Sequence, residues 1–129
     1  MPMDYTLDKE RQLVISVASG RLSFAEVRAH QDRLLADPNF KPEFNQLLDG
    51  RTITDLDMTV DEARLLARRP LFSDKSRRAW VSPSPAIYGM GRLMATHNEY
   101  SVAKSQVRVF YDLASAMEWL GLDNSAVRA

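Results

Sequence analysis

The chain alternates short apolar runs with longer segments in which apolar residues recur at helical spacing. Residues 5–7 and the β-branched run 13–17 enclose a polar turn, a pattern that predicts a β-hairpin. Gly20 and Gly50 are expected to end the second and third strands, because glycine between apolar runs is typical of a turn. The remaining strands are short and either apolar or alternating, and they are expected at residues 44–48, 78–81 and 106–111.

Helix starts are indicated by capping residues. Ser23 and Glu26 have the spacing of a capping box, and so do Thr59 and Glu62, so a helix is expected to begin after each cap. Both helices are expected to end before the next proline, because the residue preceding a proline disfavours helical backbone. Thr59 should therefore act as an N-cap.

Two further helices are expected, one over residues 85–98 and one that follows the capping residue Asp112 and stops at Gly121. The order of elements is then ββαβαβαβα. Strands separated by helices imply right-handed crossovers, so we expect an α/β fold with a mainly parallel five-stranded sheet and an antiparallel edge strand. Residues 1–129 are expected to form one domain, with a frayed tail at 121–129.

Composition excludes several classes of function. The chain has no cysteine, which excludes disulfides, thiolate chemistry and Cys-ligated zinc. Its 17 basic and 17 acidic residues give a formal charge of zero, so no overall field attracts nucleic acid. The N-terminus does not have the pattern of a signal peptide, and no apolar run has the length of a spanning helix. We therefore expect a cytoplasmic protein without a membrane-spanning segment or a nucleic-acid partner.

Catalytic and metal-binding patterns are weak. The two histidines, His30 and His97, are far apart in the chain, and neither has a second ligand at metal-binding spacing. His30 is expected to be solvated on its helix. Residues 82–85 could receive an anion at a helix start, but serine and proline are also ordinary helix-start residues. We predict no catalytic residue, no cofactor and no metal.

Two segments are candidates for holding a ligand. Asp49 and Arg51 follow the third strand, at the edge of the sheet where open α/β folds bind ligands, but they could equally form ion pairs with each other or with Arg92. The segment 88–92 has two glycines inside an expected helix, each costing about 1 kcal/mol relative to alanine, which indicates close packing or room for a ligand. The candidate ligand-binding residues are Asp49, Arg51, Tyr88, Gly89, Gly91 and Arg92.

Strand alternation also predicts a candidate interface. Right-handed crossovers keep adding helices to one face of a sheet and leave the other thinly covered. Trp80 and Phe110 are expected on that thin face, where with neighbouring arginines they would form an apolar patch suited to a homodimer. The alternative is that the opening segment or the C-terminal tail covers them. The candidate interface residues are Trp80, Phe110, Arg78 and Arg108.

Residues 47–51, 88–94 and 109–120 occur in the order seen in SpoIIAA-like proteins, and the chain resembles that branch of the STAS superfamily as far as Leu120. The resemblance implies a βα superhelix, related to CRAL-TRIO lipid-binding domains, and a non-catalytic binding or regulatory role. Anti-sigma-factor antagonists of the superfamily carry a phosphorylatable serine in an Asp-Ser-Ser-Gly stretch. Here the corresponding residues are 57–60, and Met58 at the acceptor position offers no hydroxyl.

Two functions remain open from the sequence. The first is a regulatory module that binds a protein partner or a second copy of itself, without turnover. The alternative is a carrier of a small anionic or lipidic ligand, held between the segments 49–51 and 88–92. The lack of a recognisable nucleophile and base argues against an enzyme.

Overall fold

The computed structural model describes residues 3–98 and 106–123. Within them the strands and helices follow the predicted order. The strands are β1 (Met3–Asp8), β2 (Leu13–Ser23), β3 (Asn45–Asp57), β4 (Arg77–Val81) and β5 (Gln106–Phe110). The helices are α1 (Phe24–Ala36), α2 (Val60–Arg68), α3 (Pro85–Asn98) and α4 (Leu113–Trp119).

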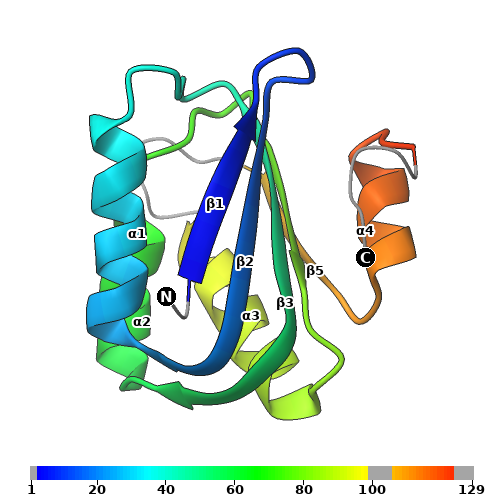
Figure 1. Ribbon diagram of the computed structural model, residues 1–129. Helices are drawn as coiled ribbons and strands as arrows, with labels where there is room; N and C mark the ends of the chain where they lie inside the picture. Colours follow the sequence, from blue (N-terminus) through cyan, green and yellow to red (C-terminus); the bar gives the residue numbers. More distant parts are fainter. Residues whose placement is uncertain (1–2, 99–105, 124–129) are drawn as a thin grey trace.

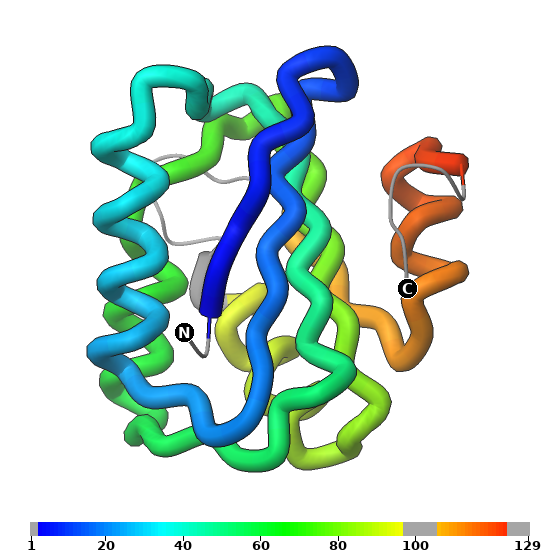
Figure 2. The backbone as a smooth tube through the Cα atoms, in the orientation of Figure 1, coloured from blue at the N-terminus to red at the C-terminus, as the bar shows by residue number. Residues whose placement is uncertain are grey.

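The strands form one sheet in the order β1-β2-β3-β4-β5, so each strand pairs with its neighbour in the chain. β1 and β2 are antiparallel, and the other three pairs are parallel. Figure 2 shows this sequential order as a steady change of colour across the sheet. The α/β class and the mainly parallel sheet with one antiparallel edge strand are confirmed.

The helices cover both faces of the sheet, but unequally. α1, α2 and α3 lie on one face and α4 lies alone on the other (Figure 1). α4 packs Ala116 and Met117 against Leu47 and Ala79 of the sheet. The face that crossovers alone would leave thinly covered is therefore closed by α4 from the same chain.

The predicted capping residues begin their helices. Ser23 accepts a hydrogen bond from the Glu26 N–H at 3.3 Å, and Thr59 accepts one from the Glu62 N–H at 3.1 Å. The side chain of each glutamate in turn accepts a hydrogen bond from the backbone N–H of the cap residue, which completes the capping boxes. Asp112 likewise accepts from the N–H of Ser115 at 2.8 Å.

β2 and β3 continue beyond the glycines that were expected to end them. The register of β2 against β3 shifts on either side of Gly20, which has a φ of +65° and bends the strand. Gly50 lies in the run of β3, where a Cβ atom would stand 2.7 Å from the carbonyl oxygen of Val81. The prediction was wrong because these glycines permit a bend and a close approach inside strands.

The end of α4 is better packed than expected. Gly121 adopts a φ of +72°, and the N–H of Leu122 donates to the carbonyl of Met117 at 2.9 Å. Leu122 also packs against the apolar cluster under α4. The expected fraying therefore does not begin at Gly121, and residues 124–129 lie outside the described part of the chain.

Candidate ligand-binding site

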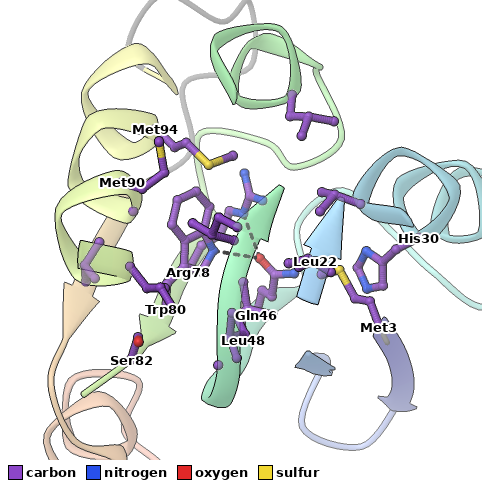
Figure 3. A pocket seen from close by; sticks show the side chains of 18 of the residues that line it. Met3, Leu22, His30, Gln46, Leu48, Arg78, Trp80, Ser82, Met90 and Met94 are labelled. Atoms are coloured by element: carbon purple, nitrogen blue, oxygen red, sulfur yellow. Dashed lines mark hydrogen bonds between the residues drawn. The ribbon is translucent and has the colours of Figure 1, made fainter. Parts of the chain in front are cut away.

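A cavity of about 100 Å³ lies between the sheet and the layer formed by α1, α2 and α3. Its walls are mostly apolar. In Figure 3, Met90 and Met94 of α3 lie on one side, Met3 and Leu22 of the first two strands lie on the other, and Arg78 stands between them. The cavity therefore lies on the face of the sheet that carries three helices.

Strand alternation brings a set of polar side chains to this face of the sheet, and two of them, Gln46 and Arg78, line the cavity. Ser16, Gln46 and Arg78 occupy neighbouring strands on the face that carries three helices, and each is at most 9% exposed. Gln46 and Arg78 are partners in the parallel register of β3 and β4. Buried polar groups of this kind require hydrogen-bond partners or a ligand.

A continuous chain of hydrogen bonds joins these groups, and Figure 3 shows its part between Gln46, Arg78 and Trp80. Gln46 Oε1 accepts from Arg78 Nε at 3.0 Å and from Trp80 Nε1 at 3.2 Å. Gln46 Nε2 donates to Ser16 Oγ at 3.2 Å, and Ser16 Oγ lies 3.0 Å from His30 Nε2. The chain therefore joins residues of β2, β3, β4 and α1, and Gln46 stands at its centre.

The donor and acceptor of each hydrogen bond can be assigned by starting at Arg78 and following the chain to His30. Arginine and tryptophan can only donate, so the oxygen of Gln46 must face them and its amide nitrogen must face Ser16. Ser16 then has its own proton to place, and the acceptor found for it among the described residues is His30 Nε2. The imidazole proton consequently resides on Nδ1, which has no hydrogen-bond partner within the described chain.

His30 is 2% exposed, and the prediction of a solvated histidine was wrong. It shares the sheet-facing side of α1 with Val27 and Leu34, which are three residues before it and four after it. That spacing was visible in the sequence and is the signal that could have identified its burial. Burial, helped by the charges of Arg33 and Arg78, lowers the pKa of His30 to about 4, so the side chain is neutral at pH 7.

Arg78 is the charged group of the cavity. Its side chain is buried, and its guanidinium lies 4.3 Å from the ring centroid of Phe72 and 5.2 Å from that of Trp80. Within residues 3–98 and 106–123, no carboxylate lies within ion-pair distance, and the hydrogen bond found is the one from Nε to Gln46. Burial lowers the pKa of Arg78 to about 9, which leaves it a cation at pH 7.

The candidate site residues on β3 lie elsewhere. Arg51 donates from Nε and Nη2 to the two carboxylate oxygens of Asp49, at 3.0 and 2.9 Å. They therefore form the ion pair that the sequence left open as an alternative to a ligand site. Neither side chain lines the cavity, and the structure does not bring them together with the segment 88–92.

The segment 88–92 divides between two environments. Gly91 lines the cavity and packs near Val109, where a Cβ atom would stand 3.4 Å from its methyl groups, so close packing is confirmed there. Gly89 has no atom within 4 Å of a Cβ position, so the same prediction was wrong for it. Tyr88 and Arg92 instead line a separate surface hollow beside β5.

The candidate interface patch does not form. Trp80 pairs with Val109 in the register of β4 and β5, so it shares a face with Val109 and not with Phe110. Trp80 is 8% exposed and lies inside the cavity wall with Arg78, whereas Phe110 packs against the cluster under α4. The prediction placed Trp80 on the wrong face because the register between the strands cannot be read from either strand alone.

Two further structural findings concern metal ions and membranes. The described residues contain no group of three or more His, Cys, Asp or Glu side chains placed to hold a metal ion. No helix in that part of the chain has the length and apolar character needed to cross a membrane. The side chain of His97 lies outside the described residues.

Comparison with known proteins places the architecture. No model of a known protein family matches the sequence, and no curated protein matches it either. A crystal structure of an uncharacterized protein from the DUF3478 family with a SpoIIAA-like fold, from Shewanella loihica PV-4, matches with a TM-score of 0.58. The match covers 92% of this chain and 93% of that one.

The chain has a SpoIIAA-like fold. At 17% identity the likeness establishes the SpoIIAA-like fold alone, and the similar protein is itself uncharacterized. The architecture implied by the sequence resemblance is therefore confirmed. The function has to be argued from the cavity.

Proposed function

We propose that this protein binds a small molecule with an acidic head and an apolar body, without chemically altering it, in the cavity between the sheet and helices α1 to α3. The observation that carries the proposal is Arg78, a buried cation with no carboxylate partner among the described residues. A charge taken out of water requires a partner of opposite sign, and an anionic ligand would supply it.

Arg78 is prepared for an anion before the ligand arrives. Gln46 fixes its Nε, and the rings of Phe72 and Trp80 flank the guanidinium. Folding has already removed most of its water, so a ligand would have to lose only its own hydration on binding. Such preorganisation favours affinity because fewer groups must be ordered or dehydrated in the binding step.

The remaining walls suit an apolar body. The cavity is lined by Leu22, Leu48 and Leu66 and by several methionines, whose flexible side chains adapt to ligands of different shape. A dry apolar cavity of roughly 150 Å³ is known to hold a benzene ring. At about 100 Å³ the present cavity is smaller than that, so it suits a short, slender acyl chain better than a ring.

The contact between Ser16 and His30 supports binding more than catalysis. The pair has the distance of a nucleophile and its base, 3.0 Å, but Ser16 is fully buried and already accepts from Gln46. A histidine whose pKa is lowered to about 4 is a weak base at pH 7. These features suit a hydrogen-bond chain that positions Gln46.

Hexanoate is a suitable probe, because it combines a carboxylate with a short acyl chain. Trp80 lines the cavity and can report binding by its fluorescence, once Trp119 is replaced by phenylalanine to leave one tryptophan. We expect a saturable change in emission with hexanoate. Arg78→Met in the same background removes the charge while keeping a long apolar side chain, and should weaken binding at least ~10-fold.

A titration with no saturable change, or equal affinity with and without Arg78, would reject the proposal. Native mass spectrometry of protein purified gently from its own cells offers a second test, in which a stoichiometric small-molecule adduct is expected. The regulatory role through a protein partner or homodimer stays a prediction, now without the surface that the sequence had assigned to it.

A further inference from the structure

We infer that Gln46 makes the cavity selective for a single negative charge, so that its ligand is a monocarboxylate and neither a neutral molecule nor a dianion. The inference rests on the proposed function and specifies the ligand class. It comes from the hydrogen-bond partners of Arg78 and not from the cavity's shape.

Gln46 holds Arg78 without neutralising it. Its oxygen accepts the Nε proton at 3.0 Å, the geometry that a glutamate at the same position would have. A glutamate would add a counter-ion and leave the cavity without net charge. Because the amide is neutral, the whole positive charge of Arg78 remains for a ligand, which can approach the two terminal guanidinium nitrogens side by side.

The count of charges sets the selectivity. A monocarboxylate balances the one cation, whereas a neutral ligand leaves the buried guanidinium without a counter-ion. A dianion would bring a second charge against walls such as Leu48, Met90 and Met94, where no second cation lines the described cavity. An unpaired charge in such surroundings is strongly disfavoured.

The chain of hydrogen bonds allows Gln46→Glu to be tested without breaking the fold. A carboxylate cannot donate to Ser16, but the hydroxyl of Ser16 can reverse and donate to the carboxylate. His30 can then move its proton from Nδ1 to Nε2 and donate to Ser16 at the same 3.0 Å distance. Every hydrogen bond of the network is retained in this arrangement.

The first experiment uses the unaltered cavity. We expect hexanoate to bind at least ~10-fold more tightly than hexanamide, its neutral analogue, or adipate, a dianion of the same length. Trp80 fluorescence in the Trp119→Phe protein gives all three affinities. Equal affinities for hexanoate and hexanamide, or tight binding of adipate, would overturn the inference and need no variant at Gln46.

The second experiment introduces a negative charge at position 46. In Gln46→Glu we expect hexanoate affinity to fall at least ~10-fold while hexanamide affinity is maintained, because the arginine is then neutralised internally. Gln106→Glu adds the same charge at an exposed position of β5 and should leave both affinities unchanged. If Arg78→Met abolishes hexanoate binding but Gln46→Glu does not, the inference fails and the proposed function stands. If hexanoate does not bind the unaltered cavity, the proposed function itself fails.

Discussion

Arg78 imposes a cost on the folded chain that a ligand would offset. Its guanidinium is buried beside two aromatic rings. Replacing whole buried ion pairs by apolar side chains of similar volume is often neutral or stabilising by about 1–4 kcal/mol, and a buried cation without a carboxylate partner lacks even the attraction within such a pair. We predict that Arg78→Met raises the free energy of unfolding by ~1 kcal/mol or more in the ligand-free protein. Urea denaturation measures the difference.

The lost contacts with Phe72 and Trp80 work against this gain, but methionine keeps most of the apolar stem. Arg77→Met is the matched control, because Arg77 is the exposed neighbour of Arg78 in β4. Arg77 contacts Trp119, through a hydrogen bond to its carbonyl at 3.2 Å and through its ring, but at an exposed position, so the loss of these contacts should change stability little. A clear loss of stability in Arg78→Met would show that the guanidinium is held by contacts stronger than those described.

His30 makes stability depend on pH. The folded protein binds its proton only near pH 4, whereas the unfolded chain does so near pH 6.5, so the unfolded state is favoured as pH falls between these values. We predict that the free energy of unfolding decreases over this window, with a slope of at most about 1.4 kcal/mol per pH unit from this residue. In His30→Gln this part of the slope should disappear. Urea titrations at intervals from pH 7 to 4 test it, and parallel curves for the two proteins would contradict the assignment.

At the scale of elements, the two glycines of α3 separate helix propensity from packing. Gly89 has free space around it, so Gly89→Ala should stabilise the protein by up to about 1 kcal/mol. Gly91 lies against Val109 and Trp80, so Gly91→Leu should destabilise by more than ~1 kcal/mol through overpacking. Thermal or chemical denaturation measures both. A neutral or stabilising Gly91→Leu would contradict the close packing of α3 on β5.

The N-cap of α2 offers a test of the same kind. Thr59 accepts from the Glu62 N–H at 3.1 Å and begins the helix. Thr59→Ala should lower the free energy of unfolding by ~1 kcal/mol, as is usual for loss of a capping hydroxyl. Thr59→Ser keeps the hydroxyl and should be close to neutral, so equal losses in the two variants would argue against capping.

Local patterns in the sequence predicted the elements well but not how they face one another. Capping boxes and alternation are properties of one segment, so the starts of α1, α2 and α4 and the existence of each strand were accessible. The face shared by Trp80 and Val109 depends on the register between two strands, which neither strand specifies alone. The cavity was missed for the same reason, because Gln46 and Arg78 become neighbours only when β3 and β4 pair.

At the scale of the whole molecule, the sheet separates two interiors. The cavity lies on one face, and a close-packed cluster of Leu13, Leu47 and Val81 lies under α4 on the other. Among the described residues, the short helix α4 is what covers that cluster. If α4 detaches, this face of the sheet becomes exposed. Loss of α4 would create an apolar patch of the kind that promotes association.

This arrangement predicts the effect of a charge beneath α4. Met117→Asp places a carboxylate among apolar side chains and should lower the free energy of unfolding by at least ~2 kcal/mol. It should also produce concentration-dependent association in sedimentation velocity, as the uncovered sheet face becomes accessible. Ala114→Asp, on the exposed side of the same helix, should do neither. If both variants associate to the same extent, the surface responsible for association is not the sheet face beneath α4.

The sequential strand order has a consequence for the order of assembly during synthesis. Every strand pairs with the one that left the ribosome just before it, so no strand has to be inserted between two that are already joined. A chain growing from its N-terminus can extend the sheet one edge at a time, in keeping with the tendency of domains to fold as they are made. β3 is then in place when β4 arrives, and the guanidinium of Arg78 enters the interior with Gln46 already positioned to receive it.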